Sequence, residues 1–104
     1  MKNNIIKNYI IKKSNIHGNG IFTTKFIKKW SKIDVGIKYY FLFIPLITKF
    51  GSMINHSYKP NCELLRDKSK YWIISSEDLK FDIELTLNYN KCPWFIDRAK
   101  LHYK

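Results

Sequence analysis

The apolar residues of this chain come in short runs separated by polar residues, glycines and prolines. Runs rich in β-branched and aromatic side chains predict five strands, at residues 4–13, 21–24, 32–37, 70–76 and 83–87. In the last run, three apolar residues alternate with Glu84 and Thr86, so the two sets are expected on opposite faces of a sheet. The run at 70–76 is apolar at successive positions, which fits a strand buried on both faces.

Turn-forming residues lie between these runs. His17-Gly18-Asn19-Gly20 predicts a turn, because glycine and asparagine tolerate positive φ angles. Pro45 interrupts the apolar segment 39–50, which is expected to form a helical turn or two beside a loop. A polar turn is predicted at 55–62 and a terminal helical turn at 93–101. Many short strands and little helix predict a mainly β fold of several small sheets.

The length and composition are those of one compact domain. The chain has 104 residues, 45% of them hydrophobic and 16% aromatic, so we expect a single domain over 1–104. A core of this size leaves little stability to spare, which favours a homodimer. No apolar run is long enough to span a membrane, and no signal peptide is expected. Cys62 and Cys92 lack metal-ligand spacing, so neither a zinc site nor a disulfide is expected and the compartment is intracellular.

The net charge of +11 comes almost entirely from lysine. One interpretation is an acidic partner, such as DNA or an acidic protein surface. The other is codon usage, since Lys, Asn and Ile dominate the chain as they do in products of AT-rich genomes. The charges are spread along the sequence, which weakens the case for one dedicated binding stripe.

Three short segments carry the candidate chemistry, and each has an ordinary interpretation. Asn55-His56 is either a hydrogen-bonded turn or a clamp that holds the polar groups of a cofactor. Tyr89 is either a core residue with its hydroxyl at the surface or a buried phenol that hydrogen-bonds a reacting amine. Gly18-Asn19-Gly20 on its own is a β-turn, and the strand that follows it argues against a dinucleotide-binding helix.

Taken in order, these segments resemble the SET-domain family of protein-lysine methyltransferases. The opening motif is Ser14-Asn15-Ile16-His17-Gly18-Asn19-Gly20-Ile21-Phe22-Thr23, and the central motif is Phe50-Gly51-Ser52-Met53-Ile54-Asn55-His56-Ser57 with Pro60-Asn61-Cys62. The closing motif is Glu84-Leu85-Thr86 with Tyr89-Asn90. The resemblance covers about residues 5 to 101. The short length resembles the minimal SET proteins of large DNA viruses, which lack the modules that flank the domain elsewhere.

The resemblance implies a SET fold in which the C-terminal segment passes under a loop to form a pseudoknot. It also implies S-adenosylmethionine as cofactor and no metal. Gly18, Asn19 and Gly20 would line the methionine end of the cofactor through backbone groups. Asn55 and His56 would hold its ammonium group and adenine.

For catalysis, the resemblance makes Tyr89 the catalytic tyrosine and makes Tyr39 or Tyr40 a wall of the lysine channel. The substrate would be a histone tail or another lysine-bearing protein, placing the enzyme on chromatin, in an infected host's nucleus if the source is viral. Because a +11 enzyme repels a basic tail, help from nucleosomal DNA or from an acidic groove is expected.

The chain departs from the family pattern at several positions. Phe81-Asp82-Ile83-Glu84 replaces the usual Gly-Glu-Glu turn, and Tyr58 stands where a cysteine is common. Pro93 occupies the position of a channel aromatic, and Trp94 is the candidate to replace it. These departures leave two alternatives open: a decayed SET domain that acts as a binding module, and a small basic protein that binds nucleic acid.

Overall fold

The structure is a computed structural model that describes residues 7–40 and 44–91, with only the backbone of Tyr40. Two antiparallel sheets and one parallel pair make up this part of the chain. β1 (Tyr9–Lys13) pairs with β2 (Asn19–Thr23) as a hairpin. The largest sheet has the order β4-β3-β7-β6, from β4 (Ile44–Ile47), β3 (Lys32–Tyr40), β7 (Lys70–Ser75) and β6 (Cys62–Asp67). The mainly β architecture of small sheets with little helix is confirmed.

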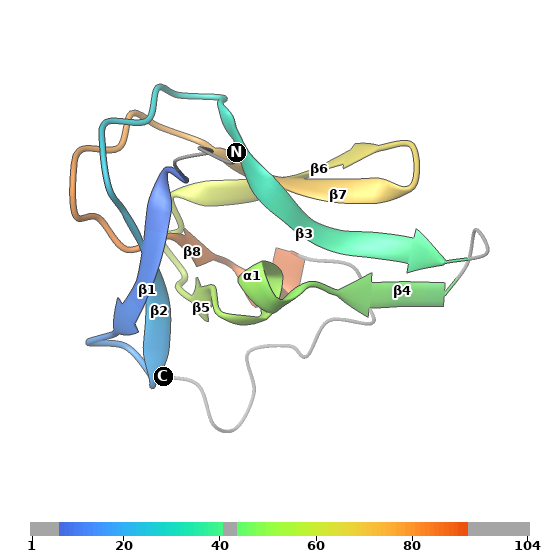
Figure 1. Cartoon of the computed structure of the whole chain (residues 1–104), viewed down its shortest axis with the longest axis horizontal. Coiled ribbons are helices and arrows are strands. Elements are labelled where there is room, and N and C mark those ends of the chain that lie inside the picture. The colour runs from blue at the N-terminus through green and yellow to red at the C-terminus, as the bar shows by residue number, and fades with distance from the viewer. Residues whose placement is uncertain (1–6, 41–43, 92–104) are drawn as a thin grey trace, which may run out of the picture.

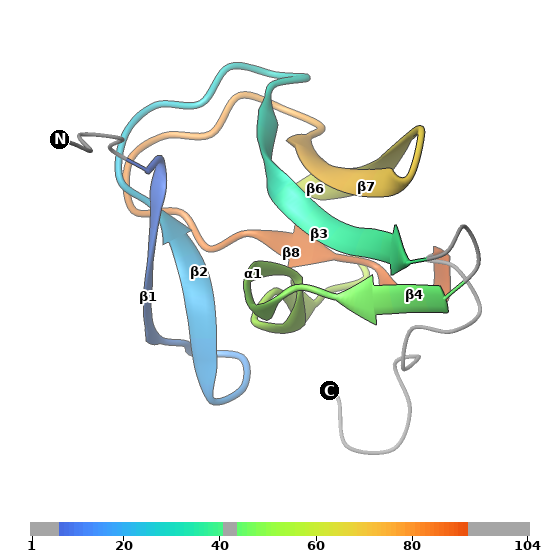
Figure 2. The ribbon, with the colours of Figure 1, turned by 45° about the vertical axis from the view of Figure 1, so that its right-hand side comes forward.

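The third sheet is the parallel pair of β5 (Asn55–His56) and β8 (Thr86–Leu87). The only helical elements of the described residues are α1 (Lys49–Ser52) and the 3-10 helix η1 (Tyr89–Lys91). Figures 1 and 2 show the β1–β2 hairpin on one side and the four-stranded sheet on the other, with α1, β5 and β8 between them. The central and closing motifs of the sequence therefore lie side by side in the middle of the molecule.

Two long loops, at 24–31 and 76–85, run together along one edge of the molecule (Figures 1 and 2). Ile27 and Leu79 form an isolated antiparallel bridge between them, with both N–O distances 2.8 Å. Further along, the amide of Leu85 donates to the carbonyl of Ile21 at 2.8 Å. These bonds bring the closing motif beside strand β2, which carries the opening motif.

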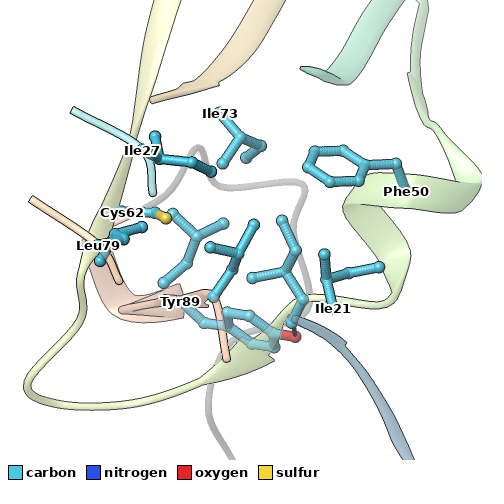
Figure 3. Packing of buried hydrophobic residues seen from close by; sticks show 10 residues of the cluster. Ile21, Ile27, Phe50, Cys62, Ile73, Leu79 and Tyr89 are labelled. Carbon is cyan, nitrogen blue, oxygen red and sulfur yellow. Dashed lines mark hydrogen bonds between the residues drawn. The ribbon is translucent and has the colours of Figure 1, made fainter. Parts of the chain in front are cut away.

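The hydrophobic core fills the space between the hairpin, the four-stranded sheet and β8, and Figure 3 shows it from close by. Each fully buried aliphatic side chain contributes about 1.5–3 kcal/mol to stability. The cluster takes residues from β2, β6, β7, β8, both helical elements and the segments between elements: Ile21, Ile27, Phe50, Ile54, Cys62, Ile73, Leu79, Leu85, Leu87 and Tyr89. Tyr89 therefore belongs to the core by its ring, so its position is set by packing as well as by hydrogen bonds.

The apolar segment 39–50 was predicted as helical turns beside a loop, and this is wrong for its middle. Ile44–Ile47 form β4, an edge strand in which Pro45 lies opposite Tyr39 of β3. An edge strand tolerates proline because one side of its backbone has no ladder to complete. Helical structure is confined to α1, whose N-cap Thr48 accepts from the amide of Gly51 at 3.0 Å.

Other boundaries also differ from the prediction. β3 continues to Tyr40 instead of ending near Gly36, and the strand β6 was not predicted at all. In the run 83–87 only Thr86–Leu87 form a strand, Ile83 is 36% exposed, and Thr86 is buried, so the predicted division into faces is wrong at those two positions. The run 70–76 is confirmed as β7, and Ile73 and Ile74 are both buried.

Several expectations fall outside the described residues. These are the N-terminal part of the strand at 4–13, the helical turn at 93–101, and the passage of the C-terminal segment under a loop beyond Lys91. Within the described part, the parallel pairing of Asn55 with Thr86 and of His56 with Leu87 places the closing strand against the central motif.

Candidate functional site

Asn55 lies where the three sequence motifs meet. It is in β5, opposite Thr86 of β8, and only 5% of its surface is exposed. Its side-chain nitrogen Nδ2 lies 3.0 Å from the carbonyl oxygen of His17 and 3.3 Å from that of Asn19. An amide nitrogen carries two hydrogens, so at any moment it can donate to two of the oxygens around it. Asn55 thus fixes the glycine turn against the central motif.

The same nitrogen reaches two further side chains, which join the closing motif to the opening motif. Asn55 Nδ2 lies 2.8 Å from Glu84 Oε2 and 3.1 Å from Ser14 Oγ. The Ser14 hydroxyl in turn lies 2.8 Å from both carboxylate oxygens of Glu84. We call Ser14, Asn55 and Glu84 the polar cluster. It contains one side chain from each motif, so it holds all three in register.

The two glycines of the opening turn are required for different reasons. Gly18 has a φ of +48°, a left-handed conformation that glycine adopts without strain, and a Cβ there would meet no atom within 4 Å. Gly20 lies in β2, and a Cβ there would lie 2.2 Å from Glu84 Oε2. Gly20 is therefore required by the close approach of the Glu84 carboxylate, while Gly18 leaves open space beside the turn.

His56, the neighbour of Asn55, is 2% exposed and contacts the closing motif directly. Its Nδ1 accepts a hydrogen bond from the backbone amide of Tyr89 at 3.1 Å, so this nitrogen carries no proton. Burial of the ring lowers its pKa, which favours the neutral imidazole. The ring also packs edge-on against Tyr58 and Tyr89, with centroids 4.3 and 5.3 Å away.

Tyr89 begins η1 and is 9% exposed. Its hydroxyl donates a hydrogen bond to the backbone carbonyl of Ile54, the residue before Asn55. Because this hydrogen is directed at a carbonyl, the phenol oxygen can act toward an incoming amine only as a hydrogen-bond acceptor. The amide and the hydroxyl together attach Tyr89 to two residues of the central motif, His56 and Ile54.

Asn61 is a further connection between the central and closing motifs. Its Nδ2 donates to the carbonyl of Glu84 at 2.9 Å, and its Oδ1 accepts from the amide of Thr86 at 2.9 Å. The side chain imitates a neighbouring strand at the point where β8 begins. We gave no role to Asn61, Ser14 or Glu84 from the sequence, although all three lie within the quoted motifs.

The residues predicted for the lysine channel are not brought together by the described contacts. Tyr39 lies on β3 near Tyr71, and the Arg66 guanidinium lies 4.5 Å from the Tyr39 ring centroid. With Arg66, Lys68 and Ser69 it lines a cavity of about 270 Å³. The side chain of Tyr40 and all of Trp94 and Pro93 lie outside the described residues. A channel role for Tyr39, Tyr40 and Trp94 stays a prediction.

The same part of the chain offers neither a metal centre nor a reactive thiol. Residues 7–40 and 44–91 contain no group of three His, Cys, Asp or Glu side chains that could hold a metal ion. Cys62 is a free thiol with 1% exposure, and burial raises its pKa to about 12, so it is not a reactive nucleophile. No helix in these residues is long and apolar enough to cross a membrane.

Known proteins share the fold of this chain. Its fold matches that of a crystal structure of a Plasmodium falciparum protein named as a candidate histone methyltransferase, with a TM-score of 0.68 and 22% sequence identity. The match covers 86% of this chain and 99% of that chain. No curated protein sequence matches. The SET domain family matches residues 37–90, just over half of the chain and including the central and closing motifs. The chain belongs to the SET-domain family.

Proposed function

We propose that this protein is an S-adenosylmethionine-dependent protein-lysine N-methyltransferase that acts on a histone tail, with Tyr89 as its catalytic tyrosine. The observation that carries the proposal is the convergence of the opening turn, Asn55 and Tyr89 through the polar cluster and the Tyr89–Ile54 hydrogen bond. The histone in the name of the Plasmodium falciparum protein supports this choice of substrate.

The chemistry around the opening turn suits this cofactor, which carries a positive ammonium group and a positive sulfonium. Oxygen acceptors gather there: the carbonyls of His17 and Asn19 and the carboxylate of Glu84 all lie within 3.3 Å of Asn55 Nδ2. Cations are stabilised by such acceptors. The open space beside Gly18 lets a ligand approach the backbone closely. Glycine turn and polar cluster are therefore the expected site for the methionine end.

When bound, the cofactor would supply an electrophilic methyl group for in-line transfer to the target lysine nitrogen, and its sulfonium sulfur would leave as a neutral thioether. The lysine amine, with an ordinary pKa of about 10.4, must arrive without its proton. Removal from water and the nearby positive charge both lower that pKa. The Tyr89 oxygen, with its own hydrogen held by the Ile54 carbonyl, accepts from an amine N–H and orients the nitrogen lone pair.

His56 has an indirect part in this arrangement. By accepting from the Tyr89 amide it fixes the start of η1, so the phenol is presented from a defined backbone position. Its neutral state is needed for this bond, because a protonated Nδ1 would face the amide hydrogen as a second donor. We then expect the backbone around Asn55 and His56 to bind the adenine.

The test uses labelled S-adenosylmethionine, core histones, the wild type and Tyr89→Phe. The phenylalanine keeps the buried ring and removes the hydroxyl, at a cost to stability of about 1 kcal/mol for one hydrogen bond. We expect histone methylation to fall by about 10²–10³-fold, while cofactor affinity measured by calorimetry changes less than about threefold. Unchanged methylation by Tyr89→Phe would remove Tyr89 from the mechanism. Peptide binding by the wild type without any methylation would favour a decayed SET domain.

A further inference from the structure

A second region of the molecule carries positive charge around a cavity of about 580 Å³. Its walls come from β1, β3 and α1 and from the chain just before β1 and at the start of β7. No member of the polar cluster lines it, and neither does Tyr89. Ten described residues line it, and four of them are lysines, namely Lys7, Lys38, Lys49 and Lys70. We call this feature the lysine cavity.

The positive charge of the lysine cavity is poorly neutralised by the protein itself. Asp34 is the only acidic residue among the described residues that line it, so four lysines and one aspartate give a formal charge of +3. The Asp34 carboxylate already accepts the Tyr9 hydroxyl and lies 3.8 Å from Lys7 Nζ. In the part of the chain that the structure describes, no carboxylate comes within ion-pair distance of Lys38, Lys49 or Lys70.

Two of these lysines face each other across the sheet. Lys38 of β3 and Lys70 of β7 are directly opposed in the antiparallel register. Like charges in this position destabilise a sheet. Asp67 is opposite Lys70 on its other side, but its carboxylate pairs with Lys32 at 3.4 Å. The free protein therefore bears a local repulsion that a bound anion would relieve.

We propose that the lysine cavity binds the phosphate backbone of duplex DNA. Its charges are ammonium groups distributed over several elements, which suits a chain of phosphates better than one compact anion. The described residues that line it include no Arg, Asn or Gln, the side chains that most often make bidentate contacts to base edges, so we expect binding that does not depend on sequence. The net charge of +11 adds long-range attraction to the same partner.

This assignment gives the proposed enzyme a means to act on a basic substrate, and to that extent it rests on the proposed function. A histone tail and a +11 protein repel each other in isolation. In a nucleosome, the DNA beside the tail would hold the enzyme by the lysine cavity and raise the local concentration of the tail at the cofactor site. The binding of DNA itself needs neither cofactor nor catalysis, so it can be measured separately.

The test compares two triple variants with the same change in net charge. Lys38→Gln, Lys49→Gln and Lys70→Gln are combined in the cavity variant, and Lys25→Gln, Lys28→Gln and Lys80→Gln in the control, which alters exposed lysines of the paired loops. Binding to a fluorescent duplex of about 20 base pairs is measured between about 50 and 200 mM salt. We expect the cavity variant to bind at least about tenfold more weakly, with its salt slope smaller by up to about 2.7, at 0.9 for each phosphate contact. The control should lose less than about threefold.

Equal losses in the two variants would overturn the proposal, because the attraction would then come from diffuse charge. Tighter binding of polyglutamate than of the duplex at equal salt would also overturn it, in favour of an acidic protein partner. In a second readout, the cavity variant should keep wild-type methylation of a free histone peptide and lose at least about tenfold on nucleosomes. If the wild type methylates neither, the proposed function fails, and the DNA-binding result still decides this assignment.

Discussion

The polar cluster and the lysine cavity differ in whether their charged side chains have partners within the protein. In the polar cluster, the half-buried carboxylate of Glu84 lies 2.8 Å from both Ser14 Oγ and Asn55 Nδ2. In the lysine cavity, three ammonium groups have no carboxylate within reach among the described residues, and two of them oppose each other. The Glu84 carboxylate has hydrogen-bond donors within the protein, whereas the ammonium groups of Lys38, Lys49 and Lys70 are exposed to solvent.

This difference predicts opposite effects of substitutions on the stability of the protein in the two regions. A half-buried carboxylate with hydrogen-bond donors stabilises the fold as long as these partners stay in place, and removing one of them leaves a polar group without its partner. Opposed lysines destabilise the fold, so removing one of them relieves repulsion. Substitutions in the polar cluster should therefore destabilise the protein, while substitutions in the lysine cavity should be neutral or stabilising and should change binding instead.

The largest effect is expected from Gly20→Ala. The new methyl group would lie 2.2 Å from Glu84 Oε2 and 3.1 Å from Ser14 Cβ, so the carboxylate must move away from its donors. We expect the free energy of unfolding to fall by about 2–3 kcal/mol, measured by urea denaturation.

Two variants sharpen this result. Glu84→Ala removes the clashing atoms. In the double variant, Gly20→Ala should therefore lower the free energy of unfolding by less than it does alone, with a coupling energy of about 1–2 kcal/mol. Gly18→Ala is the matched control, because its new methyl group would meet no atom within 4 Å. The φ of +48° strains alanine at a cost of about 1–2 kcal/mol, and this substitution should show no coupling to Glu84. Additive effects of Gly20→Ala and Glu84→Ala would contradict the close approach.

A smaller effect is expected from pH, through His56. Burial lowers its pKa in the folded protein, whereas in the unfolded chain the pKa is near its ordinary value of about 6.5. The unfolded state therefore binds the proton more readily, and His56 contributes stability above pH 6.5 that is lost as the pH falls below it. The loss is at most about 1.4 kcal/mol per pH unit.

Urea denaturation at a series of pH values checks this prediction. His56→Gln cannot take up the proton and should flatten the dependence below pH 6.5, although it is less stable overall. His17→Gln, which changes an exposed histidine of the opening turn, should keep the wild-type dependence. If His56→Gln keeps the same slope as the wild type, another group is responsible for the acid sensitivity.

The smallest effect is expected from Lys38→Glu in the lysine cavity. This change replaces the repulsion from Lys70 by attraction and should stabilise the protein by about 0.5 kcal/mol. Thermal unfolding at low salt would detect it, and high salt should abolish it. Lys25→Glu makes the same change in net charge at an exposed loop position, and a gain as large from it would show that only net charge matters.

Much of the fold follows from local sequence patterns, and the exceptions have identifiable causes. β7 was predicted because its run of apolar residues is continuous and bounded by polar ones. β4 was missed because Pro45 argues against a strand unless the strand lies at an edge, and the position of a strand in a sheet is not a local property. β6 was missed because Glu63, Arg66 and Asp67 obscure its pattern, and its pairing with β7 decides its structure.

The candidate site was predictable in its motifs but not in its connections. The resemblance singled out Asn55, His56, Tyr89 and the glycine turn, and the structure places Asn55 at the turn and His56 against Tyr89. The resemblance gave no reason to expect a hydrogen bond between Ser14 and Glu84, which are 70 positions apart in the sequence. Such a bond depends on how the hairpin and the closing motif pack, so the roles of Ser14, Glu84 and Asn61 emerge only from the three-dimensional arrangement.

The central claim is that the three motifs together form a cofactor site, and calorimetric titration with S-adenosylmethionine tests it most directly because no substrate must be guessed. We predict saturable binding of one cofactor per chain by the wild type and its loss in Asn55→Ala, with urea denaturation used to choose conditions in which both are folded. Absence of binding by the folded wild type, or full binding by folded Asn55→Ala, would contradict the account.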